Sequence, residues 1–203
     1  METVFDEYRI TNGTIKWKGT TTSESTKLGC TGKLSLETEL KTVVKTCEGD
    51  EVLSIDIPTK QTGTLSLHMP VETARKAFGL NTKGLKKGVF AYGTQSRQGG
   101  GCLTFDVYDI FEEMKKLMAL PNITFSGGFK WELENGNEEI AEVEIEFQSL
   151  KDEGNNFYYE ALESEVEDED VKTKWHENFS YALVKEAVPA AKNRTAQTDK
   201  GAA

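Results

Sequence analysis

Several ingredients of common protein classes are scarce in this chain of 203 residues. It contains two histidines and three cysteines, and the cysteines lie far apart with no CxxC spacing. This pattern predicts neither a disulfide framework nor a zinc site, and it is typical of a cytoplasmic protein. No run of about 18 apolar residues occurs, so we expect no membrane-spanning helix. The first residues, METVFDEYRI, lack a basic start followed by an apolar stretch, so we also expect no secretory signal.

Basic charge is scarce in one part of the chain. The net charge is −10, and residues 131–170 contain 16 of the 34 acidic residues but one of the 24 basic residues, Lys151. A protein that binds nucleic acid through its phosphates needs the opposite balance, so specific nucleic-acid binding is not expected. An acidic surface that favours solubility is the simpler interpretation of this charge.

Alternation of apolar and polar residues predicts strands along most of the chain. In residues 142–147, EVEIEF, the side chains of Val143, Ile145 and Phe147 share one face and are expected in the core. The opposite face is expected to carry Glu142, Glu144 and Glu146. Further strands are predicted at 9–18 (with a hairpin turn at Asn12-Gly13), 33–44, 64–69, 88–94, 102–109, 129–134 and 155–162.

Helices are predicted at few places. Residues 71–78 place apolar side chains on one face after Pro70, and Gly79 is suited to end the helix. A short helix is predicted at 170–178. Residues 109–119 fit either a helix or a strand. The residues after Val188 are small and polar, which predicts disorder at 189–203.

Two long segments, 45–62 and 162–175, are predicted to be largely irregular. Long loops in a compact domain are usually functional or disordered. The first is too apolar for simple disorder, which favours a loop that packs against a partner. Its candidate contact residues are Glu51, Val52, Leu53, Ile55 and Ile57.

The sequence gives no support for catalysis. Asp106 and Asp109, with Glu112 and Glu113, are interpreted as a hydrated turn because no histidine or cysteine lies nearby to complete a metal site. Gly99-Gly100-Gly101 lacks the GK[ST] ending of a phosphate loop and is interpreted as a hairpin turn. His68 and His176 occupy polar positions and belong to no nucleophile motif, and the tryptophans are interpreted as packing residues. We therefore expect no enzyme and no cofactor.

Ordered segments over residues 32–184 resemble the major tail (tail tube) proteins of long-tailed phages of Gram-positive bacteria. The segments are TGTLSLHMPVETARKAFGL, GLKKGVFAYGTQSRQGGGCLTFDVYD, ALPNITFSGG, ENGNEEIAEVEIEF, DEGNNFYYEAL and VKTKWHENFSYALV. The resemblance implies a mainly β fold, a β-sandwich with one flanking α-helix at 71–78, a long inter-strand loop and a flexible C-terminal tail. It also implies one tail-tube domain, residues 1–188.

The same resemblance implies a structural virion protein that forms hexameric rings stacked into a tail tube. The 45–62 loop would reach the adjacent ring. Implied partners are other copies of the chain, a tape measure protein, a tail terminator and a distal tail protein, in a virion tail assembled in the host cytoplasm. Double-stranded DNA would pass through without specific binding, and Glu142, Glu144 and Glu146 would repel it if they line the lumen.

Other interpretations of the sequence remain open. A monomeric acidic β-sandwich that binds a partner is the main alternative, and a β-sandwich hydrolase using Asp106 and Asp109 is a third. The resemblance fits contractile and non-contractile tails, and phages as well as phage-derived particles. It also leaves open whether the acidic face points to the lumen or outward.

Overall fold

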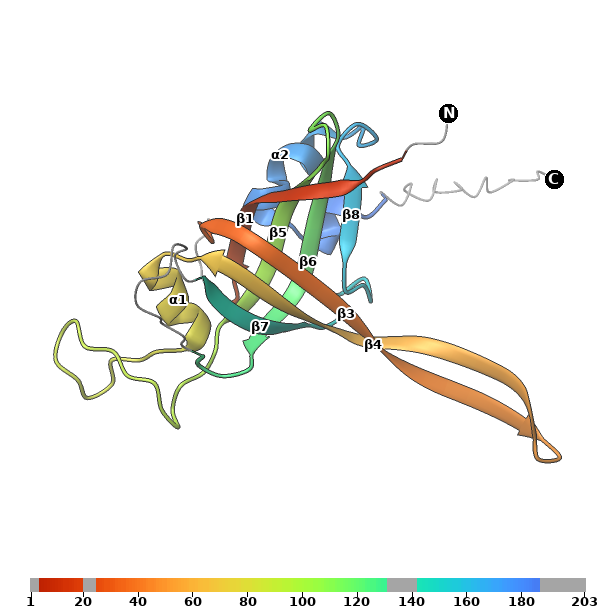
Figure 1. The fold of residues 1–203 in the computed structure, drawn as a ribbon, viewed down its shortest axis with the longest axis horizontal. Helices are drawn as coiled ribbons and strands as arrows, with labels where there is room; N and C mark the ends of the chain where they lie inside the picture. Colours follow the sequence, from red (N-terminus) through yellow and green to blue (C-terminus); the bar gives the residue numbers. More distant parts are fainter. Residues whose placement is uncertain (1–3, 20–24, 131–141, 187–203) are drawn as a thin grey trace, which may run out of the picture.

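A computed structural model describes residues 4–19, 25–130 and 142–186. Over these residues, eight strands form one antiparallel sheet with three short helices around it (Figure 1). The strands are β1 (Glu7–Trp17), β2 (Thr26–Lys27), β3 (Cys30–Cys47), β4 (Asp50–His68), β5 (Gly100–Asp109), β6 (Lys115–Ser126), β7 (Val143–Ser149) and β8 (Tyr159–Leu162). The helices are α1 (Val71–Phe78), α2 (Glu169–Asn178) and α3 (Tyr181–Val184). The predicted mainly β fold is confirmed.

The sheet curls so that one face encloses the core. Its strand order is β2-β1-β5-β6-β7-β4-β3, and β8 pairs with the first half of β6. In Figure 1, β3, β4 and β7 cross over β1, β5 and β6. The two groups of strands are joined where β6 pairs with β7, with Phe125 opposite Phe147. At another point of the crossing, the amide of Leu28, just before β3, donates to the carbonyl of Gly13 on β1 at 2.9 Å. The two layers of the sandwich therefore belong to one continuous sheet. Their shared core includes Ile15, Leu65, Leu67, Leu103, Phe105, Ile123, Phe125, Ile145 and Phe147.

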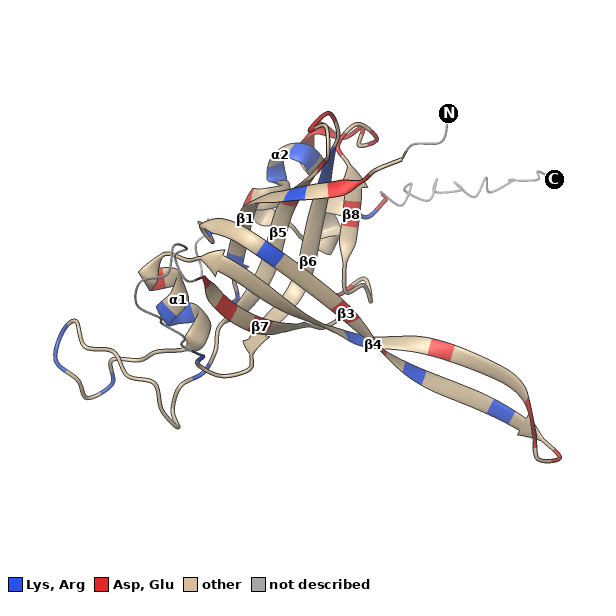
Figure 2. Ribbon diagram, viewed as in Figure 1, with Lys and Arg blue, Asp and Glu red and all other residues tan. Residues whose placement is uncertain are grey.

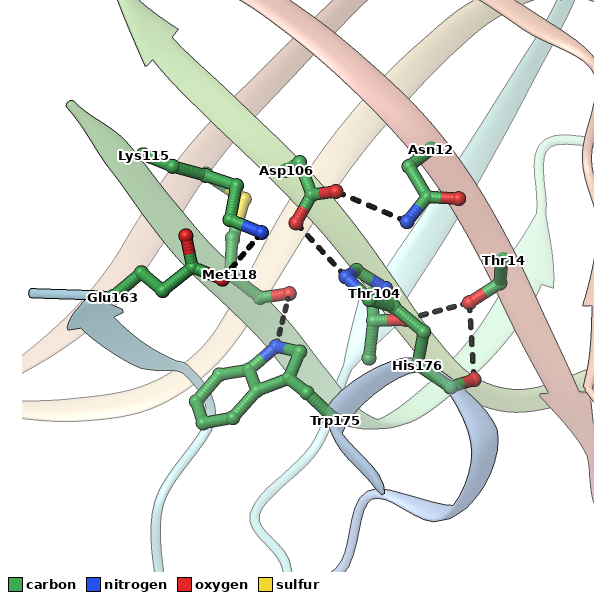
Figure 3. A network of polar contacts seen from close by, with 9 residues as sticks. All are labelled: Asn12, Thr14, Thr104, Asp106, Lys115, Met118, Glu163, Trp175 and His176. Atoms are coloured by element: carbon green, nitrogen blue, oxygen red, sulfur yellow. Dashed lines mark hydrogen bonds and ion pairs between the residues drawn. The ribbon is translucent and has the colours of Figure 1, made fainter. Parts of the chain in front are cut away.

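Strand β5 is buried on both faces. Leu103, Phe105 and Val107 point into the main core. On the other face, α2 covers the sheet, and Trp175 packs with Cys102 in a second apolar cluster. The ring nitrogen Nε1 of Trp175 donates to the carbonyl of Met118 at 3.2 Å, which satisfies the polar atom of this buried side chain (Figure 3).

The helix predictions are confirmed in position. Helix α1 spans the predicted residues, and Gly79 ends it with a left-handed φ of 72°. Helix α2 begins one residue before its predicted start, and the side chain of Asp168 accepts a hydrogen bond from the amide of Asp170 at its N-terminus. Part of the segment 162–175 that was predicted to be irregular is therefore helical.

The pair Asn12-Gly13 does not form the predicted hairpin turn. Strand β1 continues through it, and the pairing with β5 shifts register between Thr11 and Thr14. Asn12 has a φ of 52°, which a β-bulge accommodates as well as a turn does. The Asn-Gly pair therefore does mark a residue with a positive φ, but that residue lies in a β-bulge and not in the predicted turn.

The hairpin turn predicted at Gly99-Gly100-Gly101, between the predicted strands 88–94 and 102–109, is also absent. Within 88–94, one isolated bridge links Ala91 to Asn81, and β5 pairs with β1 and β6 instead. Gly100 and Gly101 lie inside β5 rather than in a turn. A Cβ atom on Gly101 would stand 2.0 Å from the carbonyl oxygen of Lys16, so the glycine permits close approach of two backbones.

The ambiguous segment 109–119 is resolved in favour of a strand. Asp109 ends β5, a turn follows, and β6 starts at Lys115. The predicted strand at 155–162 is limited to β8. The predicted strand at 129–134 lies largely outside the described residues, as does the predicted tail at 189–203. In the described part of the chain, no helix is both long and apolar enough to cross a membrane.

Candidate functional site

The β3–β4 hairpin extends far beyond the rest of the sheet (Figure 1). Strand β4 pairs with β7 as far as Gln61, and within the described chain residues 39–60 pair only across the hairpin. We call residues 39–60 the arm. All residues from 39 to 59 are exposed, and at about 3.3 Å per residue the arm is roughly 30 Å long.

The arm corrects the prediction of an irregular loop at 45–62. Cys47 pairs with Asp50, and Glu48 and Gly49 between them have φ values of 52° and 97°. Positive φ at both central residues is typical of a type I′ turn, whose twist matches that of paired strands. The alternation of Leu53, Ile55 and Ile57 with polar residues was present in the sequence. It was missed because Glu-Gly is a weaker turn signal than Asn-Gly.

The register places the apolar residues of the arm mainly on one face. Opposed residues of an antiparallel pair project to the same side, and Val43 opposes Ile55. On that face, Lys41 opposes Ile57 and Lys45 opposes Leu53. The result is an apolar stripe flanked by two lysines. The remaining predicted contact residues lie near the tip, where the pairing shifts register beside Val52 and Glu51 pairs with Thr46.

The opposite face of the arm is more polar. Thr42 opposes Asp56, and the hydroxyl of Thr42 donates to the Asp56 carboxylate at 2.6 Å. Val44 opposes Ser54 on this face. Among the described residues, seven of the 17 exposed large apolar side chains belong to the arm, which marks it as a surface suited to contact. The prediction from 45–62 missed three of them, Leu40, Val43 and Val44.

A second candidate surface is the outward face of β3, β4 and β7. Ile145 and Phe147 of β7 are buried as predicted, so Glu144 and Glu146 project outward. Across the sheet, Ser35, Thr64 and Glu146 form one row and Lys33, Ser66 and Glu144 the next. We call these six residues, with Glu37, Thr62 and Gln148 of the adjacent row, the polar face.

The expected ladder of like charges on this face is interrupted. The Lys130 ammonium lies 3.9 Å from the Glu144 carboxylate and is hydrogen-bonded to Glu146. That hydrogen bond and the charge of Glu146 raise the pKa of Lys130. Glu142 lies before β7, with a carboxylate oxygen 4.0 Å from the His68 ring nitrogen Nε2. The face is therefore less acidic than the strand sequence alone indicated.

A third cluster lies between the sheet and α2 (Figure 3). The His176 ring nitrogen Nε2 is 2.9 Å from Asp106 Oδ1, and Nδ1 is 3.0 Å from the Thr104 hydroxyl. The Thr104 hydroxyl is 2.6 Å from that of Thr14, which lies 3.3 Å from the His176 carbonyl oxygen. Asn12 donates to the other oxygen of Asp106 at 3.0 Å.

This cluster corrects the interpretation of Asp106 and Asp109 as part of a hydrated turn. Asp106 is 5% exposed because α2 covers its face of β5. Asp109 is also buried and accepts a hydrogen bond from the amide of Met114. Asp106 and His176 are 70 residues apart, so sequence spacing could not pair them.

The ionised form of Asp106 is favoured. Burial on its own would raise the pKa of Asp106. The hydrogen bond and charge of His176, the amide of Asn12 and the charge of Lys115 outweigh burial and hold the pKa below the ordinary value of 3.8.

The order Thr104–His176–Asp106 superficially resembles a catalytic triad. Thr104 is 3% exposed, and its hydroxyl already contacts Thr14 and His176, so this order presents no accessible nucleophile. Among the described residues, no group of three or more His, Cys, Asp or Glu side chains is placed to hold a metal ion. The geometry is that of a structural connection between α2 and the sheet.

Comparisons with known proteins cover both the sequence and the structure. The sequence matches no protein-family model and no curated protein. The chain is similar in structure to an anti-feeding prophage cap. That protein is described as the tube terminating cap, and the alignment covers 79% of this chain and 96% of the cap. The TM-score is 0.40 with 8% sequence identity, and a similarity of this size carries no inference about fold family or function.

Proposed function

We propose that this protein is a structural subunit that assembles with copies of itself into stacked hexameric rings, forming a phage-type tail tube through which DNA passes. The support comes from the ordered sequence segments that resemble tail tube proteins and from the mainly β fold. The observation that carries the proposal is the arm, because it is too exposed and too apolar for a free surface.

In this proposal the arm makes the contact between rings. Its apolar stripe includes Leu53, Ile55 and Ile57, each about half exposed in the single chain. Burial of apolar surface contributes roughly 25 cal/mol per Å², and a ring repeats the same contact at every copy. A modest stabilisation per arm therefore becomes a large one per ring.

The charges at the two ends of the molecule suit contact between copies. The tip of the arm carries Glu48, Asp50 and Glu51, whereas the connection between α1 and β5 carries Lys83, Lys86 and Lys87. These groups lie at opposite ends of the ribbon (Figure 2). A head-to-tail contact would bring unlike charges together, and such contacts generate rings or open stacks.

The polar face is proposed to line the lumen. Among its nine residues, Lys33 is the one cation, beside three glutamates and five uncharged polar side chains. Lys130, which lies next to the face, is paired with Glu144 and Glu146. DNA phosphates bind clusters of free lysine and arginine with release of counterions, so a wall of this kind offers them little attraction.

Electron microscopy of the purified protein tests the proposal. Wild type is expected to form rings or tubes in negative stain. A deletion within one strand, such as residues 51–57, would leave the paired half of β3 without its partner. We therefore choose a symmetric variant in which residues 39–60 are replaced by Asn-Gly between Thr38 and Gln61, which oppose each other in the ladder.

The trimmed variant should remain folded and fail to stack. Tubes of normal length from the trimmed variant would remove the arm from the ring-to-ring contact. A wild-type protein that stays monomeric at all concentrations would instead support the alternative function, a monomeric acidic β-sandwich that binds a partner.

A further inference from the structure

Exposed large apolar side chains gather at three places on the described part of the chain. One group lies on the arm, and a second lies on α1 and the connection that follows it. The third lies where β1 begins and β5 ends, and it comprises Val4, Tyr8, Ile110 and Phe111. The last two belong to residues 110–113, which we call the β5–β6 turn. Because exposed apolar groups of this kind mark contacts, the third group is a contact surface in addition to the arm and the connection.

The β5–β6 turn presents its apolar side chains on a fixed support. The Asp109 carboxylate accepts a hydrogen bond from the amide of Met114 at 2.9 Å, and the Arg9 guanidinium pairs with Glu112 at 2.8 Å. Phe111 is 77% exposed, more than any other large apolar side chain of the described residues. An aromatic side chain on a rigid turn is suited to anchor an interface, because little conformational freedom is lost on binding.

The end of the molecule that carries the β5–β6 turn has an excess of acidic charge. Three cations of β1 and β6 near the turn are each paired with a carboxylate, in the pairs Arg9–Glu112, Lys115–Glu163, Lys116–Glu7 and Lys116–Glu160. Glu113 is exposed and makes no ion pair within the described residues. A partner for the turn therefore needs an apolar surface with positive charge beside it.

The apolar stripe of the arm has this combination. Val43 and Ile55 oppose each other at its centre, and Lys41 and Lys45 lie on either side of Val43 along β3. Both lysines are exposed, and neither forms an ion pair in the part of the chain that the structure describes. An apolar centre between two free cations is complementary to an apolar turn with carboxylates beside it.

The tip and the stripe of one arm do not both fit on the same neighbouring copy. Ile55 lies four residues from Glu51 of the tip, which is roughly 13 Å along a strand. The α1–β5 connection and the β5–β6 turn lie at opposite ends of β5, whose 10 residues span roughly 30 Å (Figure 1). An arm whose tip meets the connection of one copy therefore places its stripe against the turn of a different copy.

We propose that the stripe of each arm docks on the β5–β6 turn of one copy while its tip reaches the α1–β5 connection of another, so that one arm joins two neighbours. This inference rests on the proposed function, because it names the surface that the stripe covers in the assembly. Each contact joins two different surfaces of the chain, which is the head-to-tail arrangement that closes rings or extends stacks.

Disulfide trapping between two chains tests the contact of the stripe. Cys30 and Cys47 are changed to Ser, and the buried Cys102 is retained. One chain then carries Val43→Cys and the other Ile110→Cys, so each chain has a single exposed thiol. When the two are mixed and oxidised under assembly conditions, we expect a covalent dimer that peptide mass spectrometry identifies as a link between positions 43 and 110.

Val44→Cys is the matched control for this link. Val44 is 41% exposed against 45% for Val43, but it projects to the opposite face of the arm. The geometry of a disulfide is specific, so position 44 should link to position 110 about tenfold more slowly than position 43 does. If tubes form and the two positions link at equal rates, the stripe docks elsewhere and the proposed tube stands. If the wild type forms neither rings nor tubes and no link forms, the proposed function fails together with this inference.

The same assay tests the role of charge. Lys41→Glu with Lys45→Glu in the arm chain should slow the 43–110 link about tenfold at low salt, because like charges then face each other. Glu113→Lys in the other chain should restore much of the rate. A rate that is unchanged by both sets of substitutions would overturn the assignment of the turn as the partner of the stripe.

A product of three chains tests whether one arm joins two neighbours. The arm chain now keeps Cys47 and carries Val43→Cys, and it is mixed with a Leu85→Cys chain and the Ile110→Cys chain, both with Ser at positions 30 and 47. Positions 43 and 47 of one strand are too far apart to form a disulfide with each other. We expect a species that contains one copy of each chain. If both two-chain products form and the three-chain product does not, the two contacts exclude each other and the bridge is wrong.

Discussion

The reactivity of Cys102 measures how well α2 shields the sheet from solvent. This residue is packed with Leu117, Ala119 and Trp175, and burial raises the pKa of its thiol to about 12. Because thiolates rather than thiols react, a maleimide or disulfide reagent at pH 8 should label the exposed Cys30 and Cys47 and leave Cys102 unmodified. Mass spectrometry of the labelled peptides measures this. Labelling of native Cys102 as fast as Cys30 would show that α2 does not cover it.

Gly101 is a residue whose backbone contact has a measurable effect on stability. An added Cβ would stand 2.0 Å from the Lys16 carbonyl oxygen, so Gly101→Ala must push β1 away from β5. We expect this change to lower the free energy of unfolding by about 1–3 kcal/mol, the usual range for overpacking. Gly93→Ala is the matched control, because nothing lies within 4 Å of its added Cβ. Equal urea midpoints for the two variants would contradict the close approach.

Residue-level patterns predicted the core more successfully than the polar cluster. Alternation correctly placed Ile145 and Phe147 inside, since a half-buried strand shows its period in any window of a few residues. Asp106 was misread because its polar face of β5 is covered by a helix that begins 63 residues later in the sequence, at Glu169. Burial by a distant element leaves no local signal.

At the scale of elements, the arm combines a correct and an incorrect prediction. The long strand at 33–44 was predicted, and it continues as one side of the arm. The other side was interpreted as a loop, although the residues inferred to contact a partner do lie on an exposed projection. The prediction of a turn at residues 99–101 was wrong for a related reason. Glycine is favoured both in turns and where two backbones approach closely, and Gly100 and Gly101 lie inside β5.

Two adjacent substitutions separate the faces of the arm. Ile55 lies on the apolar stripe, and Ser54 projects to the opposite face. If the stripe is buried between rings, Ile55→Lys should abolish stacking, because an unpaired charge would be buried there. Ser54→Lys introduces the same charge at the neighbouring position on the opposite face, and this variant should form longer stacks than the Ile55→Lys variant. Tube length by negative-stain microscopy is the measurement, and equal behaviour of the two variants would argue against a one-sided contact.

At the scale of the whole molecule, the separated charges make a test by mixing possible. Reversal of the arm tip (Glu48, Asp50 and Glu51 to Lys) should block assembly, as should reversal of Lys83, Lys86 and Lys87 to Glu. In a mixture of the two variants, the lysines of a reversed tip can meet the glutamates of a reversed α1–β5 connection. The acidic tip of the second variant can likewise meet the lysines of the first variant's native connection, so the two variants should assemble as alternating copies. Light scattering at low salt measures this, since screening weakens exposed pairs at high salt. If the wild type assembles and the mixture of variants does not, the arm tip does not pair with the α1–β5 connection of another copy.

The proposed lumen leads to a prediction about DNA passage rather than folding. Changing Glu142, Glu144 and Glu146 to Lys leaves Ile145 and Phe147 in the core, so the subunit should fold and tubes should assemble. Lys130 would also lose its two carboxylate contacts and add to the new positive charge. Each ring of the proposed tube would then attract phosphates, and particles carrying the variant should eject DNA slowly at low salt and faster as salt rises.

A control with the same total charge separates the lumen from other surfaces. Glu153, Glu165 and Glu167 are exposed acidic residues away from the polar face, and changing all three to Lys gives an equal change in net charge. This control should eject DNA at the wild-type rate if the polar face is the one that lines the channel. If both triple variants eject at the wild-type rate at low salt, the polar face points outward, and its carboxylates act on solubility alone.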